Sequence, residues 1–179
     1  MASMLNPSIR EVSLDKELST SAGVIRRSFR TVADEFGLTR ENCPGHTAFL
    51  TSKDLRNERD HGLKCFGLFS GRKQIGFVGI EEYMTDALVG LGPGENRYWL
   101  EKLAVLPSHR HEGYGEKLVD FAVHYVQERG GTSIVLGMIN EHSVLKTWYL
   151  GLGFREVELR KFDHLPFVVC FMEKVLRRV

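Results

Sequence analysis

The chain contains few cysteines, and they show no pairing pattern. Its 179 residues include only Cys43, Cys65 and Cys170, which are widely spaced and form no C-x-x-C pair. An odd number of isolated cysteines argues against a disulfide framework and fits reduced thiols in a cytoplasm. We therefore expect a cytoplasmic protein.

Long apolar runs and an excess of one charge are also missing. No run is long enough to cross a bilayer, and the first twenty residues lack a basic start followed by an apolar core. The 24 Lys and Arg residues nearly balance the 23 Asp and Glu residues, which leaves a net charge of +1. That balance offers no bulk attraction to nucleic acid or to an anionic membrane, so we expect neither as a partner.

Internal repeats, low-complexity tracts and linkers are absent as well. Apolar residues make up 42% of the chain and charged residues 26%, which is ordinary for a globular protein. A chain of this length can bury a substantial core. We therefore expect a single domain over residues 1–179.

The first half of the chain predicts a long helix and a hairpin. Residues 9–14 alternate weakly and indicate a strand, while residues 51–62 begin with a helix-capping threonine and indicate a short charged helix. Residues 64–83 favour a β-hairpin around "SGRK". Between residues 15 and 36, apolar side chains recur every three or four positions, which predicts an amphipathic helix ended by Gly37. That apolar stripe consists of Leu18, Ala22, Ile25, Phe29, Ala33 and Phe36.

The second half predicts alternating strands and helices. Strands are expected at residues 98–107, 133–139, 154–162 and 167–175, with a helix over 113–129 and a short helix before residue 153. The resulting order is β-α-α-β-β-β-α-β-α-β-β. The strand–helix–strand unit over 98–139 implies two parallel neighbours joined by a right-handed crossover. We therefore expect a mixed α/β sheet rather than a doubly wound one.

The stretch "PSHRHEGYGEKL", residues 107–118, forms the corner between a predicted strand and a predicted helix. A helix start exposes unpaired amide N–H groups and carries partial positive charge, so it suits an anion. Gly113 and Gly115 leave room for a phosphate to approach the backbone, and Arg110 adds a cationic side chain. The pattern favours a diphosphate site, although a tight turn that simply uses glycines explains the same residues. It is neither G-x-G-x-x-G nor a P-loop.

The segment "LAVLPSHRHEGYGEKL" resembles the signature of the GCN5-related N-acetyltransferase (GNAT) superfamily, R/Q-x-x-G-x-G/A after a strand that ends in V-x-P. A second segment, "NEHSVLKTWYLGLGF" (140–154), is similar to that superfamily's asparagine, helix and Y-x-x-x-G-F block. The resemblance covers most of the chain and is strongest over residues 98–155.

The resemblance implies the acyl-CoA N-acyltransferase fold and acetyl-CoA as the acetyl donor. That fold is a mixed, mostly antiparallel sheet of six to seven strands, with helices on both faces and a central parallel pair splayed around the cofactor. The diphosphate would then bind amides of the 110–115 loop, the pantetheine arm would run beside the strand that ends at residue 105, and Asn140 would bond near that arm. The residues implied in cofactor binding are Leu103, Ala104, Val105, Arg110, His111, Glu112, Gly113, Tyr114, Gly115 and Asn140.

The same resemblance implies a general acid, Tyr149, which would protonate the departing thiolate, although core packing also explains a tyrosine at this spacing. Since an alkyl ammonium has a pKa of about 10.4, the reaction also needs a base, a water chain or desolvation. We predict Glu101 as that base, with Glu81 and Glu82 as alternatives. A surface acid paired with Lys102 or Arg97 explains Glu101 equally well. Glu101 would share one strand face with residues 103 and 105 if no bulge intervenes.

Several alternatives stay open at this stage. The expected activity is acetylation of a primary amine on a small molecule, or less favourably on a peptide or protein, by direct attack in a ternary complex. A non-catalytic module that senses acetyl-CoA or CoA is the second reading, and an ATP-binding α/β protein is a third. His109 and His111 form an H-x-H, but no further ligands are spaced to complete a metal site. Residues 84–97 are interpreted as a substrate-side flap or, equally well, as a disordered loop. The apolar last strand suggests that both of its faces are covered, for which a homodimer is one explanation.

Overall fold

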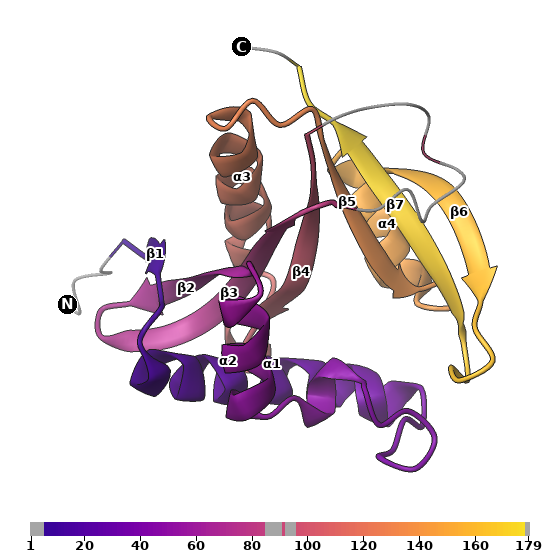
Figure 1. Cartoon of the computed structure of the whole chain (residues 1–179). Helices are drawn as coiled ribbons and strands as arrows, with labels where there is room; N and C mark the ends of the chain where they lie inside the picture. Colours follow the sequence, from indigo (N-terminus) through magenta and orange to yellow (C-terminus); the bar gives the residue numbers. More distant parts are fainter. Residues whose placement is uncertain (1–5, 85–90, 92–95, 178–179) are drawn as a thin grey trace. The chain divides into compact units, whose positions relative to one another are not determined.

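The computed structural model of the chain describes residues 6–84, 91 and 96–177, so most of the predicted 84–97 flap lies outside the described residues. The observed order of helices and strands is the predicted one, with two additional short 3-10 turns. The elements, drawn in Figure 1, are β1 (Ser8–Glu11), α1 (Asp15–Glu35), η1 (Thr47–Phe49), α2 (Ser52–Asp60), β2 (Lys64–Ser70), β3 (Lys73–Glu82), β4 (Arg97–Val105), η2 (Pro107–His109), α3 (Tyr114–Gln127), β5 (Ser133–Ile139), α4 (Ser143–Gly151), β6 (Arg155–Lys161) and β7 (Val168–Val175).

The strands form one seven-stranded sheet in the order β1-β2-β3-β4-β5-β7-β6. β4 and β5 pair in parallel, while the pairs β1–β2, β2–β3, β5–β7 and β6–β7 are antiparallel. This confirms the predicted mixed, mostly antiparallel sheet with one parallel pair. The chain divides into two compact units, which we treat separately: Met1–Ile80 with Glu101–Phe121, and Glu81–Leu100 with Ala122–Val179.

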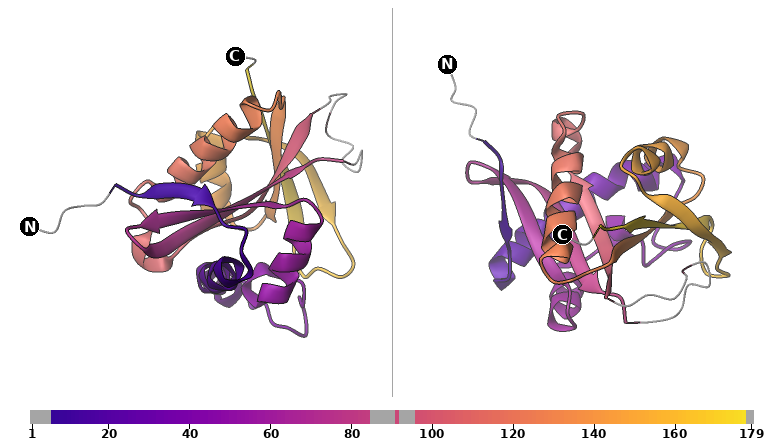
Figure 2. Two further views of the ribbon diagram at one scale, coloured as in Figure 1. Left: turned by 60° about the vertical axis from the view of Figure 1, so that its left-hand side comes forward. Right: turned by 90° about the horizontal axis from the view of Figure 1, so that it is seen from above.

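In the first unit, the apolar stripe of α1 forms the core as predicted. Leu18, Ala22 and Ile25 are fully buried, and Phe29 packs against the same core. Thr51 accepts a hydrogen bond from Asp54 N and caps α2, also as predicted. The two views of Figure 2 show α1 and α2 together on one face of the β2–β3 hairpin. The buried cluster that joins them consists of Val12, Leu18, Ala22, Ile25, Leu50, Leu55, Leu63, Cys65, Phe69, Phe77 and Ala104.

The opposite face of this hairpin carries the first two turns of α3. The Phe66 ring lies 4.8 Å from the Phe121 ring, centroid to centroid. A Cβ atom built on Gly76 would come within 3.2 Å of Leu118 Cδ1, so helix and strand approach closely here. Alternate residues of β2 therefore face different helices, which explains why the strand is buried on both faces.

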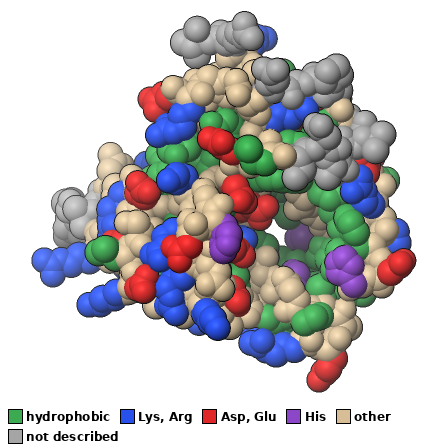
Figure 3. All heavy atoms as spheres, in the orientation of Figure 1, with side chains coloured by type: hydrophobic (Ala, Val, Ile, Leu, Met, Phe, Trp, Pro, Cys, Tyr) green, Lys and Arg blue, Asp and Glu red, His purple; other side chains and the backbone are tan. Residues whose placement is uncertain are grey.

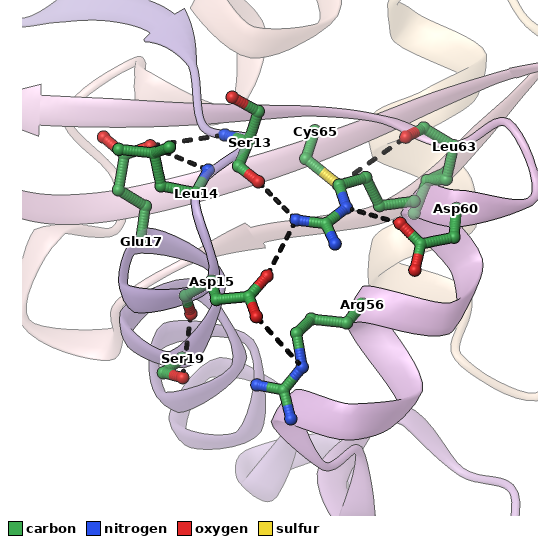
Figure 4. A network of polar contacts seen from close by, with 10 residues as sticks. Ser13, Leu14, Asp15, Glu17, Ser19, Arg56, Asp60, Leu63 and Cys65 are labelled. Carbon is green, nitrogen blue, oxygen red and sulfur yellow. Dashed lines mark hydrogen bonds and ion pairs between the residues drawn. The ribbon is translucent and has the colours of Figure 1, made fainter.

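A polar network ties the start of α1 to the end of α2 (Figure 4). The Arg59 guanidinium donates to Asp15 Oδ1 at 3.0 Å, to Asp60 Oδ1 at 2.9 Å and to the Ser13 carbonyl. The Glu17 carboxylate accepts bonds from the backbone N–H groups of residues 13 and 14, which would otherwise be unpaired at the helix start. These bonds fix the angle at which the chain enters α1.

The second unit is built around β5 and β7. Six of the seven β5 residues are buried, as expected for a strand covered on both faces. β7 lies between β5 and β6 in the sheet, and four of its eight residues are buried within this chain. Glu173 is 3% exposed and forms ion pairs with Arg97 at 3.5 Å and Arg155 at 2.5 Å.

The surface shows no segregation of charge on the face drawn in Figure 3, where Lys and Arg side chains alternate with Asp and Glu. Within the described ranges, no helix is both long enough and apolar enough to span a bilayer.

Candidate functional site

The chain makes an exposed corner between β4 and α3, where the sequence predicts an anion site. The η2 turn follows β4, and His111 and Gly113 then adopt left-handed backbone conformations with φ of 63° and 79°. α3 begins at the next residue, Tyr114. The two left-handed residues turn the chain sharply into the helix, which leaves the amides of the corner at the surface.

Six consecutive amides of this corner, from His111 to Glu116, have no hydrogen-bond acceptor among the described residues. The amides on either side are paired: Arg110 N donates to the Pro107 carbonyl at 3.4 Å, and Lys117 N donates to the Gly113 carbonyl at 3.0 Å. A helix of this length also places partial positive charge at its start. The six free donors, called the amide corner below, fit a diphosphate.

The Arg110 side chain does not form the free cationic fork that the sequence suggested. Its three guanidinium nitrogens donate within the protein, to the Val105 carbonyl at 3.3 Å, to Thr31 Oγ1 at 3.0 Å and to the Ser28 carbonyl at 2.7 Å. The Arg110 guanidinium therefore attaches the corner to α1 through hydrogen bonds. A role for the Arg110 backbone in cofactor binding stays a prediction.

His111 is a non-glycine residue in a conformation that favours glycine. A left-handed residue costs about 1–2 kcal/mol, whereas glycine loses about 0.5–1 kcal/mol through its freer unfolded chain. We therefore expect His111→Gly to raise the free energy of unfolding by up to about 1 kcal/mol and to leave CoA affinity unchanged. Urea denaturation and calorimetry measure the two quantities.

His109→Gly is the matched control, because His109 lies in η2 and is not left-handed. This variant should lose stability. Equal destabilisation of both variants would show that the left-handed conformation of His111 carries no strain.

β4 departs from a regular strand near its centre. Its parallel register with β5 ends at the Trp99–Val135 pair, although both strands continue. Lys102 has φ of 53°, so the strand is not extended there. Glu101 would share one strand face with Leu103 and Val105 only in an uninterrupted strand, and the strand is interrupted at Lys102.

Glu101 lies in an ion-pair cluster of the first unit. Lys102 Nζ is 3.6 Å from Glu101 Oε2 and 2.6 Å from Glu58 Oε2 of α2. Burial alone would lower the pKa of Lys102, but the carboxylates of Glu101 and Glu58 raise it above its usual value, so the ammonium stays charged. Of the two partners that would explain Glu101 as a surface acid, Lys102 forms the ion pair. Arg97 pairs with Glu173 instead. The Glu101 side chain is still 37% exposed and so can reach a substrate.

Tyr149 lies on α4 in the second unit with its ring buried. It packs against the Trp148 ring at 4.9 Å and the Phe154 ring at 5.3 Å, and it is 6% exposed. Burial raises the pKa of Tyr149 above its usual value, which already keeps the hydroxyl protonated at neutral pH. The described residues offer this hydroxyl no hydrogen-bond partner. It is therefore available to donate a proton to a bound molecule.

Asn140 follows directly after β5 in the second unit. Its N–H donates to the Val168 carbonyl at 2.9 Å, and its Oδ1 accepts a bond from Lys146 Nζ at 2.9 Å. Sequence reasoning missed Lys146, because nothing in the spacing of residues 140 and 146 marks the contact.

The predicted site residues thus fall into both compact units. Those from Glu101 to Gly115 lie in the first unit, and Asn140 and Tyr149 lie in the second. The alternatives Glu81 and Glu82 end β3 at the start of the second unit. No cluster of three or more His, Cys, Asp and Glu side chains suited to a metal ion occurs in the described parts of the chain.

A profile of the acetyltransferase (GNAT) family matches residues 29–154. Among curated proteins, an uncharacterised N-acetyltransferase of Oceanobacillus iheyensis is 31% identical over 81 residues. That alignment covers 44% of this chain and spans only about half of the relative, 51% of its length.

Solved structures show the same fold over nearly the whole chain. The ribosomal-protein-S18-alanine N-acetyltransferase of Escherichia coli has a TM-score of 0.72 at 15% identity, covering 97% of this chain and 96% of that one. The PaiA N-acetyltransferase of Thermoplasma acidophilum, solved in complex with coenzyme A, has a TM-score of 0.67 at 20% identity, covering 95% and 99%. At these identities the likeness shows the fold alone.

Proposed function

The chain belongs to the acetyltransferase (GNAT) family, and we propose that it moves an acetyl group from acetyl-CoA to a primary amine of a small molecule. Members of this family take their acetyl group from acetyl-CoA, so membership identifies the class of reaction and the donor. We propose further that residues 1–179 act as one catalytic domain. The observation that carries the proposal is the amide corner, whose six unpaired donors suit the diphosphate of the coenzyme.

The backbone of the first unit supplies most of the proposed cofactor contacts. Within the predicted 110–115 loop, the free amides from residue 111 onward bind the diphosphate. Leu103–Val105, the part of β4 beyond its register with β5, offers its backbone to the pantetheine arm. Asn140 of the second unit contributes a side-chain amide to the same arm. Acetyl-CoA, when bound, supplies an activated acetyl group as a thioester.

The proposed base is Glu101. An alkyl amine is protonated at neutral pH and costs roughly 4–5 kcal/mol to deprotonate, so the site needs a base, a water chain to one or desolvation before the amine attacks directly in a ternary complex. Lys102 holds one carboxylate oxygen of Glu101 at 3.6 Å and so limits the positions open to the group. Glu81, Glu82 or a water chain are the alternatives.

Tyr149 is the proposed general acid. Its hydroxyl is protonated at neutral pH, as tyrosine ordinarily is, and it lacks a partner among the described residues. The hydroxyl therefore holds the proton that the departing sulfur requires. The presence of both Tyr149 and Glu101 is why we favour an enzyme over a CoA sensor without catalysis.

The acceptor is proposed as a small molecule, with a peptide or protein amine as the second candidate. The E. coli neighbour is named for an alanine of a ribosomal protein, so both kinds of amine belong in the test. The three free, buried cysteines fit the proposed cytoplasmic location. A homodimer stays a prediction, and sedimentation velocity measures it.

A thiol-release assay tests the proposed activity. Acetyl-CoA is offered with amines, polyamines, amino acids, antibiotics and peptide N-termini, and we expect CoA release with at least one primary amine. With that acceptor, Glu101→Gln should lower kcat by about 100-fold or more, as the loss of a general base does. Glu128→Gln is the matched control, because its side chain is 77% exposed and it lies outside the proposed site.

Two results would contradict different parts of the proposal, the activity itself and the role of Glu101. Tight CoA binding without release for any amine would favour the sensor. Turnover that is unchanged in Glu101→Gln would assign the base to another group and leave the transferase intact.

A further inference from the structure

The contact between Lys146 and Asn140 fixes which way the Asn140 amide points. A lysine ammonium has three donors and no acceptor, so the atom that it faces at 2.9 Å must be the amide oxygen. The amide NH₂ group is then the end left to donate. It has no partner among the described residues, which leaves it available to an acceptor on a ligand.

Lys146 is itself held in place from β6. Its Nζ forms an ion pair with Glu156 Oε2, and Cys170 Sγ on β7 lies 3.7 Å from the same oxygen. The hydrogen bond to Glu156 raises the pKa of Lys146 above its usual value, so the ammonium stays charged. The Lys146 side chain is 24% exposed and that of Glu156 38%, so solvent screens this pair only in part.

We propose that Lys146 is a positioning residue, which turns the Asn140 NH₂ group toward a carbonyl of the pantetheine arm. The inference rests on the proposed function, since it requires a coenzyme with a pantetheine arm. Pantetheine contains two amide carbonyls, which accept hydrogen bonds from such a group. Without Lys146 the Asn140 amide can rotate, and its oxygen can then face those carbonyls instead.

A purely structural reading competes with this proposal, because the same bonds also attach α4 to β6. The two readings differ in what they predict for fragments of the coenzyme. If Lys146 acts through Asn140, its loss weakens binding of the pantetheine arm alone. If it only supports the fold, its loss affects every ligand and the melting temperature together.

Calorimetry on Lys146→Met with two ligands distinguishes the positioning role from the purely structural role. The ligands are CoA and its nucleotide half, 3′-phosphoadenosine 5′-diphosphate, which lacks pantetheine. We expect CoA affinity to fall about tenfold, the equivalent of one hydrogen bond, while affinity for the nucleotide half is unchanged. Lys146→Arg, which keeps a charged donor, should restore part of the CoA affinity.

A double-mutant cycle tests whether Lys146 acts through Asn140. Asn140→Ala should weaken CoA binding, and adding Lys146→Met to it should cause little further loss. Lys146→Met leaves Glu156 unpaired, so the pair variant Lys146→Met/Glu156→Met serves if the single variant fails to fold. The pair variant should show the same loss for CoA alone.

The unfavourable outcomes are distinguishable. Unchanged CoA affinity in Lys146→Met, an equal loss for both ligands, or full additivity with Asn140→Ala would overturn the positioning role and leave the proposed function standing. Failure of the unmodified protein to bind either ligand would overturn the proposed function itself.

Discussion

Replacing Gly113 by aspartate should abolish detectable CoA binding while the protein stays folded. Gly113 has φ of 79° and open space around the position of a Cβ atom, so the side chain itself meets no clash. Its carboxylate would instead stand among the unpaired amides and occupy the place of an anion. Two like charges about 4 Å apart near a protein surface repel by about 4 kcal/mol, so affinity should fall by at least about 100-fold.

Gly130→Asp is the matched control for this variant. Gly130 follows α3, has φ of 72°, and likewise has nothing within 4 Å of a Cβ atom. Both substitutions carry the same backbone cost, about 1–2 kcal/mol, but only Gly113 lies in the amide corner. Equal CoA affinity in the two variants, measured by calorimetry, would show that the corner is not the binding site.

The second large effect is expected at Tyr149. Tyr149→Phe removes only the hydroxyl and keeps the ring that packs against Trp148 and Phe154. Since the hydroxyl has no partner among the described residues, stability should change little. kcat should fall by about 100-fold, the usual contribution of a general acid, with CoA affinity unchanged.

Tyr98→Phe provides the comparison for Tyr149→Phe. Tyr98 is also buried, at 8% exposed, and burial likewise raises its pKa, but it lies on β4 and has no proposed role in the chemistry. Its variant should keep full activity. A kcat for Tyr149→Phe equal to that of the unmodified enzyme would remove Tyr149 from the mechanism and point to a water as the acid.

The fold was predictable because its signals are local. The stripe of α1, the Thr51 cap and the apolar run of β5 each lie within one element, and each gave the observed element within a few residues. The predicted parallel pair followed from chain order alone. The unpaired amides of the amide corner were also predictable, because a helix start with glycines exposes amides that lack a partner within the helix. Anion binding there stays a prediction.

What could not be predicted depends on partners distant in the sequence. The Arg110 guanidinium bonds to residues 79 and 82 positions away on α1, and no local pattern reveals that pairing. The left-handed conformation of Lys102 is a property of the packed strand, since lysine has no preference for it. The contact of Lys146 with Asn140 likewise requires α4 to fold back beside the end of β5.

A crystal structure of the protein with bound CoA tests the central claim most directly. The claim predicts diphosphate oxygens about 3 Å from backbone nitrogens between His111 and Glu116, the distance of an N–H···O hydrogen bond. A coenzyme bound elsewhere, with those six amides facing only water, would contradict it.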